Sequence, residues 1–255
     1  MKLKDKVALI TGASRGLGLA TAQLFVEEGA AVICVARASL EEKIFVQEHF
    51  RASPKAGYRR VDITKPEEVK TLAAFVQERF GRLDVLVNNA AVDTIGSVED
   101  TADEEFRRIL DVNVYGLFLV TRYLMPLMRK SGSGSSIVNV ASNIGLMGMG
   151  RRVAYTTSKG AVIQFTRSVA IDCAPLGIRV NAIAPGAINT ELVQQFFAGH
   201  ADKGFRKQVE GWHALDRFAE PLEIARGILF LASADSSYAT GSVLSMDGGY
   251  TIGKW

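Results

Sequence analysis

The segment Val7-Ala8-Leu9-Ile10-Thr11-Gly12-Ala13-Ser14-Arg15-Gly16-Leu17-Gly18 joins a short apolar run to a glycine-rich turn. The run Val7–Ile10 is typical of a buried strand, and apolar residues at helical spacing over Leu17–Glu28 predict a helix that stops at Gly29. Glycines in such a turn let a pyrophosphate approach backbone N–H groups at the start of the helix. The segment therefore predicts a nucleotide-binding strand–turn–helix unit, with an ordinary glycine-rich turn as the alternative.

Beyond this segment, short apolar runs alternate with helical patterns to the end of the chain. Strands buried on both faces read as continuous apolar runs, and their alternation with helices indicates a parallel sheet. We therefore expect an α/β fold: a single Rossmann-type, doubly wound parallel sheet of about seven strands, flanked by helices on both faces, in one domain over 1–255. Strands are expected over Val7–Ile10, Ala31–Val35, Arg59–Val61, Asp84–Val87, Ser136–Val140, Arg179–Ile183 and Val243–Met246, and helices over Leu17–Glu28, Leu40–Phe50, Pro66–Phe80, Asp103–Lys130, Tyr155–Ala174 and Leu222–Ala232.

The composition excludes several other classes of protein. The 255 residues are 48% hydrophobic and 22% charged with a formal net charge of +3, and they show no basic run of the kind that binds nucleic acid. No apolar stretch is long enough to cross a membrane, and the run after Lys6 is too short for a secretory signal. The two cysteines, Cys34 and Cys173, lie far apart and form no metal-binding cluster with histidine, so we expect no metal site and a cytoplasmic location.

The end of the second expected strand bears on the choice of dinucleotide. NAD-selective sites of this kind place an acidic residue there to accept hydrogen bonds from the ribose, whereas NADP sites place arginine near the 2′-phosphate. The sequence is Val35-Ala36-Arg37, without a carboxylate. Guanidinium groups match phosphate geometry, so Arg37 and Arg15 are expected to bind the phosphate together, unless both are simply solvated. We therefore predict a preference for NADP(H) over NAD(H).

A tyrosine and a lysine stand four residues apart in Tyr155-Thr156-Thr157-Ser158-Lys159. Positions i and i+4 share one face of a helix, so the ammonium group lies beside the phenol. A nearby cation favours the phenolate and lowers the tyrosine pKa from its usual value near 10. The pair follows the fifth expected strand, whose carboxyl end carries Ser142, and ligands bind at that edge of an open α/β sheet.

Together these features resemble the short-chain dehydrogenase/reductase family, in its compact subgroup, from end to end of the chain. The glycine spacing Gly-x-x-x-Gly-x-Gly differs from the common Gly-x-Gly-x-x-Gly and is similar to this family's turn. Ala91 stands where the family more often has glycine, and we expect slightly altered packing with function retained. The matching positions are Thr11-Gly12-x-x-x-Gly16-x-Gly18, Asp62, Asn88-Asn89-Ala90-Ala91, Asn113, Ser142, Tyr155, Lys159, Pro185-Gly186, Thr190 and Asp247-Gly248-Gly249.

The resemblance implies a hydride transfer between NADP(H) and a ketone or secondary alcohol. Tyr155 is then the acid–base, Ser142 binds the substrate oxygen, Lys159 lowers the tyrosine pKa and binds the nicotinamide ribose, and Asn113 holds a water for proton resupply. Cofactor contacts are implied or inferred at Gly12, Ser14, Arg15, Gly16, Leu17, Gly18, Arg37, Asp62, Ile63, Asn89, Ala90, Tyr155, Lys159, Pro185, Gly186, Ile188 and Thr190.

The substrate pocket is expected to be largely apolar. In the family the insertion matching 187–215 forms a lid, and here it is rich in apolar and aromatic residues, although several of them are equally consistent with ordinary packing. Arg152 is a candidate to neutralise an anionic substrate group, with simple solvation as the alternative. The histidines, His213 among them, are expected at the surface or in packing. Candidate substrate contacts are Ile144, Met149, Arg152, Val193, Phe196, Phe197 and Trp212.

The sequence is consistent with several hypotheses about function. The leading one is a reductase or dehydrogenase of a small to medium, largely apolar ketone or secondary alcohol. Within the same family stand a 3-oxoacyl-thioester reductase, with Arg107, Arg108, Arg129 and Lys130 as a surface for an acidic carrier protein, and a sugar or polyol dehydrogenase. A non-catalytic nucleotide sensor is the alternative of another class. The apolar helical region Phe106–Met128 and the tyrosine helix form the dimer interface in this family, so a homo-oligomer, dimer or tetramer, is expected.

Overall fold

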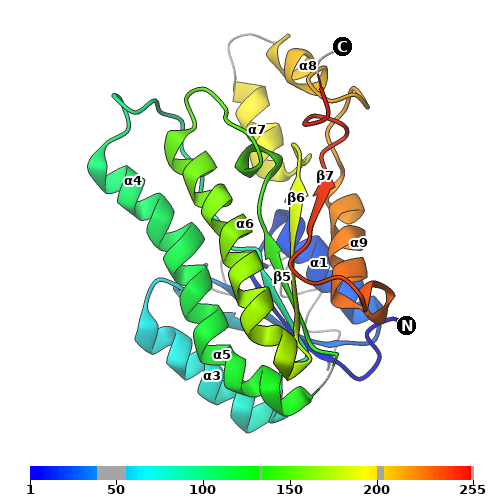
Figure 1. Ribbon diagram of the computed structural model, residues 1–255. Helices are drawn as coiled ribbons and strands as arrows, with labels where there is room; N and C mark the ends of the chain where they lie inside the picture. Colours follow the sequence, from blue (N-terminus) through cyan, green and yellow to red (C-terminus); the bar gives the residue numbers. More distant parts are fainter. Residues whose placement is uncertain (39–55, 133, 200–203, 254–255) are drawn as a thin grey trace.

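The computed structural model describes residues 1–38, 56–132, 134–199 and 204–253. A seven-stranded sheet runs through it in the order β3-β2-β1-β4-β5-β6-β7, and every neighbouring pair of strands is parallel (Figure 1). The strands are β1 (Val7–Thr11), β2 (Ala31–Ala36), β3 (Ala56–Arg60), β4 (Val85–Asn88), β5 (Ser136–Val140), β6 (Arg179–Pro185) and β7 (Val243–Met246). The predicted Rossmann-type fold is confirmed.

Helices cover both faces of the sheet, and each face has its own apolar core. On one face α1 (Gly16–Glu27) packs beside α9 (Pro221–Ala232), and Phe25 and Ile228 are fully buried there. On the other face lie α3 (Pro66–Phe80), α5 (Leu117–Ser131) and α6 (Val153–Cys173), as Figure 1 shows. Strands such as β1 and β4 are buried along their whole length and need cover on both sides, which explains the continuous apolar runs in the sequence.

The long helix expected over Asp103–Lys130 is not continuous. It consists of α4 (Asp103–Leu110), a π-helical turn η1 (Asp111–Gly116) and α5, and the turn carries the buried Asn113. Single π-helical turns within α-helices often lie at functional sites. The hydrophobic pattern of the sequence did not reveal the turn.

Smaller corrections concern the bounds of other elements. The strand expected over Arg59–Val61 is β3, which begins at Ala56, and the tyrosine helix begins at Val153, two residues before the expected start. The segment 187–215 contains two helices that the sequence analysis did not specify, α7 (Glu191–Gly199) and α8 (Phe205–Glu210). The helix expected over Leu40–Phe50 lies outside the described residues. None of the helices that the structure describes is both long and apolar enough to cross a membrane.

Candidate active site

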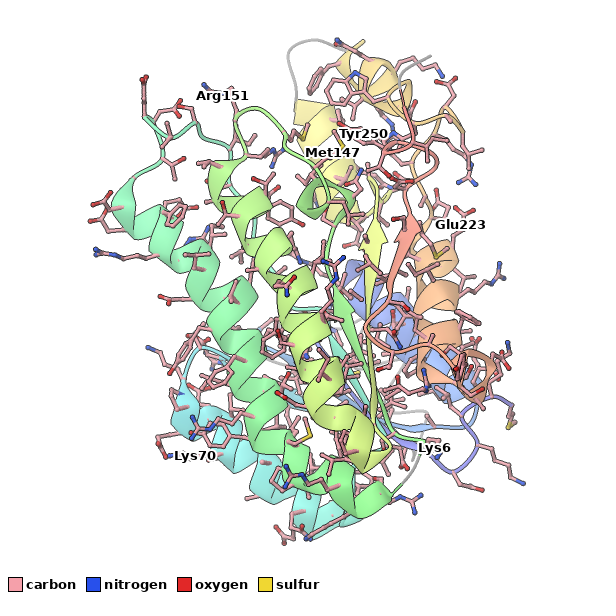
Figure 2. The ribbon with its side chains drawn as sticks, viewed as in Figure 1. Lys6, Lys70, Met147, Arg151, Glu223 and Tyr250 are labelled. Carbon is pink, nitrogen blue, oxygen red and sulfur yellow. The ribbon has the colours of Figure 1, made fainter. Side chains whose placement is uncertain are left out.

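The carboxyl ends of the parallel strands bring the predicted motifs to one edge of the sheet. The glycine turn follows β1, Asn89 follows β4, Ser142 lies just after β5, and Gly186 follows β6. The strand order reverses between β1 and β4, and a crevice for ligands forms at such a point. Figure 2 shows Met147, Arg151 and Tyr250 at this end of the molecule and Lys6 and Lys70 at the opposite end.

The glycine-rich turn is built for close backbone contact. A Cβ atom on Gly18 would lie 2.4 Å from the Gly12 carbonyl oxygen, and one on Gly12 would lie 2.8 Å from Ala90 Cα. Asn89 supports the turn, because its Nδ2 donates to the carbonyl oxygens of Thr11 at 2.9 Å and Gly12 at 3.2 Å. No side chain caps the start of α1, so its first N–H groups face the turn and are available to an anion.

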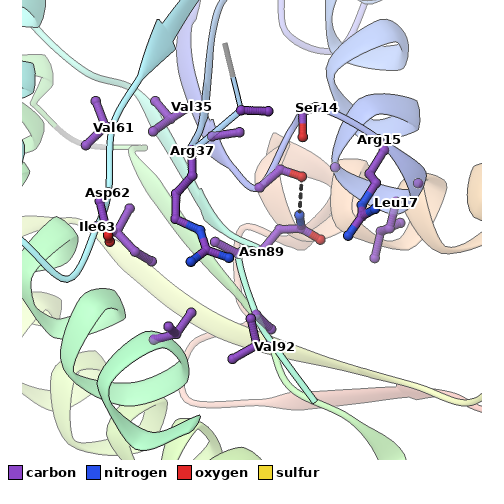
Figure 3. Close-up of a pocket in the computed structure, with 18 of the residues that line it drawn as sticks. Ser14, Arg15, Leu17, Val35, Arg37, Val61, Asp62, Ile63, Asn89 and Val92 are labelled. Atoms are coloured by element: carbon purple, nitrogen blue, oxygen red, sulfur yellow. Dashed lines mark hydrogen bonds between the residues drawn. The ribbon is translucent and has the colours of Figure 1, made fainter. Parts of the chain in front are cut away.

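A cavity of about 460 Å³ lies above this turn, between β2, β4 and α1 (Figure 3). Arg37 reaches it from the end of β2 and Arg15 from the start of α1, and both side chains are exposed. The Asp62 carboxylate is held at the rim, because its Oδ1 accepts hydrogen bonds from Thr64 N at 2.9 Å and Thr64 Oγ1 at 2.8 Å. The predicted residues that line the cavity are Gly12, Ser14, Arg15, Gly16, Leu17, Gly18, Arg37, Asp62, Ile63, Asn89, Ala90 and Thr190.

The other predicted cofactor residues do not line this cavity. Gly186 lines a second cavity nearby, and Tyr155, Lys159, Pro185 and Ile188 line neither. Several lining residues were missed by the sequence analysis, namely Val35, Ala36, Ala38, Val61, Ala91, Val92, Val112 and Glu191. Most of these lie at or just beyond the carboxyl ends of β2, β3 and β4, so the predicted sheet edge was the signal that could have found them. The cradle of glycine backbone and the two arginines fit a phosphate-bearing dinucleotide.

Lys159 is buried next to the ring of Tyr155. Its Nζ donates to the carbonyl oxygen of Val140 at 2.8 Å and lies 5.6 Å from the centroid of the Tyr155 ring. The side chain is only 3% exposed, and this burial lowers the lysine pKa to about 8, against an opposing effect of the Asp93 carboxylate. Gly145 makes the close packing possible, because a Cβ there would lie 2.8 Å from the Lys159 carbonyl carbon.

Ser142 lies close enough to Tyr155 to influence the pKa of its phenol, while Ser142 Oγ itself donates to Asn143 Oδ1 at 3.2 Å. Burial raises the pKa of Tyr155 and the Asp93 carboxylate adds to the increase, while the Ser142 hydroxyl and the Arg152 guanidinium oppose it. The tyrosine pKa is therefore raised and not lowered as expected, because burial outweighs the effects of the Ser142 hydroxyl and the Arg152 guanidinium. The neighbouring positions of Tyr155 and Lys159 are those that the helical spacing predicted.

Asn113 connects the π-helical turn to its neighbours. Its Oδ1 accepts a hydrogen bond from Val92 N at 2.8 Å, and its Nδ2 donates to Val92 O at 2.9 Å and Ser158 Oγ at 3.0 Å. The side-chain amide therefore fastens the loop after β4 to the helix that carries Lys159. Its role in holding a water stays a prediction.

A second cavity, also of about 460 Å³, opens beside Ser142. Of the predicted substrate residues it is lined by Ile144, Met149, Arg152, Val193, Phe197 and Trp212, whereas the side chain of Phe196 lies outside the description. Apart from Ser142 and Gly186, the other lining residues were missed by the sequence analysis: Asp93, Thr94, Ile95, Asn143, Ala187, Val209, His213, Phe218 and Tyr250. His213 was expected only in packing or at the surface. The rest come from separate parts of the chain, and only the fold places them together.

His213 is a buried member of this wall, 3% exposed. Its Nε2 accepts a hydrogen bond from Ala187 N at 3.3 Å, and its Nδ1 lies 3.1 Å from the carbonyl oxygen of Val209. The ring also lies 5.1 Å from that of Tyr250, centroid to centroid. The imidazole thus ties α8 to the loop after β6. Within the described ranges, no group of three or more His, Cys, Asp or Glu side chains is arranged to hold a metal ion.

Comparison with known proteins places this site in a family. A family model described as enoyl-(acyl carrier protein) reductase matches residues 12–251. Cyclopentanol dehydrogenase of Comamonas testosteroni is 40% identical over 253 residues, which is 98% of each chain. Trans-4-hydroxycyclohexanecarboxylate dehydrogenase of Sinomonas cyclohexanicum is 39% identical over 260 residues, covering 99% of this chain and 95% of the relative. The solved structure of ElxO with NADP bound is 33% identical with a TM-score of 0.91, covering 98% of this chain and all of that one.

The chain belongs to the short-chain dehydrogenase/reductase family. It is an oxidoreductase acting on the CH–OH/C=O group with a nicotinamide cofactor. The resemblance found in the sequence is thereby confirmed.

Proposed function

We propose that the protein transfers a hydride between NADP(H) and a small to medium, largely apolar secondary alcohol or ketone, with ring alcohols as the favoured class. The observation that carries the proposal is the apolar cavity that opens at Ser142, walled by Ile144, Met149, Val193, Phe197, Trp212 and Phe218. Apolar and aromatic walls with a few convergent polar groups suit such a ligand. The names of two relatives, cyclopentanol dehydrogenase and trans-4-hydroxycyclohexanecarboxylate dehydrogenase, both describe enzymes that act on ring alcohols.

The chemistry follows from three side chains, those of Ser142, Tyr155 and Lys159. When bound, the nicotinamide supplies the hydride or accepts it. Tyr155 exchanges a proton with the substrate oxygen, and Ser142, which lines the substrate cavity, hydrogen-bonds the same oxygen and stabilises developing negative charge. Lys159 lies beneath the phenol ring, where its charge favours the phenolate during alcohol oxidation. The helices α7 and α8 would act as a lid that excludes water from the reacting atoms.

The preference for NADP(H) is supported by the two arginines at the first cavity and by the absence of a carboxylate at the end of β2. The test is Arg37→Asp, with Arg107→Asp as the matched control. Arg107 is an exposed arginine on α4 that does not line the cavity. A charge-assisted hydrogen bond contributes about 1.5–3 kcal/mol, so the ratio of kcat/KM for NADPH over NADH should fall about 10- to 150-fold. An unchanged ratio in Arg37→Asp, or an equal fall in the control, contradicts the assignment.

The geometry does not favour the carrier-protein alternative. Arg108 is engaged by Glu105 at 2.6 Å, and Lys130 Nζ donates to Gln77 Oε1 at 2.6 Å. The end of α5, which carries Arg129 and Lys130, lies at the amino edge of the sheet, because Leu83, just before β4, donates to the carbonyl oxygen of Leu127. These cations therefore lie away from the substrate cavity. The apolar walls likewise do not favour sugars or polyols, and a pure sensor has no use for the Tyr155–Ser142 pair.

A homo-oligomer remains part of the proposal. Apolar side chains stay exposed on α5 and α6, including Phe118 at 37% and Ile171 at 76%. Exposed apolar residues gathered on one face are typical of contacts between subunits. The single domain and the cytoplasmic location stay predictions.

A further inference from the structure

A pair of opposite charges lies in the wall of the otherwise apolar second cavity. Asp93, in the loop after β4, and Arg152, at the start of α6, both line it together with Ser142. The Arg152 guanidinium forms an ion pair with the Asp93 carboxylate. Among the described residues that line this cavity, the only other ionisable side chains are those of His213 and Tyr250. The guanidinium expected from the sequence to meet an anionic substrate is thus already neutralised.

The backbone holds Arg152 in place independently of that ion pair. Gly96 N donates to the carbonyl oxygen of Arg151 at 2.9 Å, and Val153 N donates to the carbonyl oxygen of Gly96 at 3.3 Å. A second ion pair, between Arg151 and Asp100 at 2.9 Å, fastens the same loop outside the cavity. Removal of the Asp93 charge should therefore leave the guanidinium at the cavity wall.

A guanidinium without a protein partner is a good receptor for a carboxylate. Its planar fork donates two parallel hydrogen bonds, and in a partly enclosed cavity that interaction is stronger than in water. The Arg152 side chain is only 24% exposed, which limits competition from solvent. With Asp93 present, an incoming carboxylate must displace the Asp93 carboxylate from Arg152 or share the guanidinium with it. The two negative charges then repel each other.

We propose that Asp93 is a specificity-determining residue: by pairing with Arg152 it makes the cavity wall neutral and reserves the cavity for uncharged ring substrates over their carboxylate analogues. The proposal rests on the proposed function, because it refines the substrate class of that site. A 39% identical relative is named for a ring alcohol that bears a carboxylate, so the two kinds of substrate are a real distinction among similar chains.

Binding is the appropriate measurement, because Asp93 also raises the pKa of Tyr155 and Lys159, and turnover would combine the two effects. The dissociation constants of cyclohexanol and cyclohexanecarboxylate are measured by calorimetry on the NADP⁺-loaded protein. The variants are Asp93→Asn, the double variant Asp93→Asn/Arg152→Gln, and the matched control Asp100→Asn, which removes the other ion pair of the same loop.

Asp93→Asn is expected to bind cyclohexanecarboxylate about tenfold more tightly, or about 1.4 kcal/mol, with cyclohexanol changed less than twofold. The double variant should lose the gain, and Asp100→Asn should match the wild type. No gain in Asp93→Asn, a gain that survives Arg152→Gln, or an equal gain in Asp100→Asn overturns the proposal. Failure of the proposed function is seen separately, as absence of NADP⁺-dependent cyclohexanol oxidation by the wild type.

Discussion

Lys159→Met is expected to change how the stability of the ligand-free protein depends on pH. Burial lowers the pKa of Lys159 from its ordinary 10.5 to about 8 in the folded chain. Between these values the unfolded chain binds a proton that the folded chain has released, so the free energy of unfolding rises with pH. The stability contributed by this group is fully present above pH 10.5 and is lost as pH falls toward 8. At neutral pH the buried ammonium group is a cost.

The magnitude follows from the difference in pKa. The fall of the lysine pKa from 10.5 to about 8 corresponds to about 3 kcal/mol over the whole window, most of which falls between pH 7 and pH 10. The wild type should gain that amount relative to Lys159→Met across this range. The lost hydrogen bond to the Val140 carbonyl shifts the difference by a constant and does not alter its slope.

Urea denaturation at intervals from pH 7 to pH 10 measures the difference directly, since the other titrating groups are common to both proteins. Lys4→Met, at an exposed lysine, controls for the substitution itself. A difference between wild type and Lys159→Met that stays flat would refute the reasoning, because it would mean that Lys159 keeps its proton in the fold.

Two further predictions concern the acid–base and the phosphate-binding turn. Tyr155→Phe should lower kcat about 10²- to 10⁴-fold while the thermal shift produced by the cofactor stays close to that of the wild type; retained turnover would exclude the proposed role. Gly18→Ala places a Cβ 2.4 Å from the Gly12 carbonyl oxygen, so it should lower the free energy of unfolding by about 1–3 kcal/mol and weaken cofactor binding. Gly57→Ala is its control in urea denaturation, because a Cβ there meets no atom within 4 Å, and equal losses in both variants would argue against the steric explanation.

The Tyr155–Lys159 pair and the glycine-rich turn could be predicted from the sequence because their geometry is local. Tyr155 and Lys159 are one helical turn apart, and the glycine turn joins a strand to the helix that follows it. Backbone geometry alone brings such residues together. The interruption of the long helix at Asn113 was not readable in the same way, since a π-helical turn depends on how α4 and α5 pack against their neighbours.

The lining of the second cavity could be predicted only in part. The family resemblance pointed to the aromatic residues of 187–215, and Met149 was predicted from its place between Ser142 and Tyr155, whereas Asp93, Phe218 and Tyr250 come from segments that gave no such signal. The ion pair between Arg152 and Asp93 could not be predicted either, because the two residues are 59 positions apart in the sequence.

The sequence by itself determined the fold class, the glycine-rich turn between β1 and α1, and the neighbouring positions of Tyr155 and Lys159, because strand and helix periodicities and short spacings define them. Only the tertiary structure decided the electrostatics of the site. Burial raises the pKa of Tyr155 and lowers that of Lys159. The charge of Arg152 is balanced by Asp93, which lies in the loop after β4 and forms an ion pair with it. Burial and long-range charge depend on the whole surroundings of a group, and those surroundings exist only once the chain has folded.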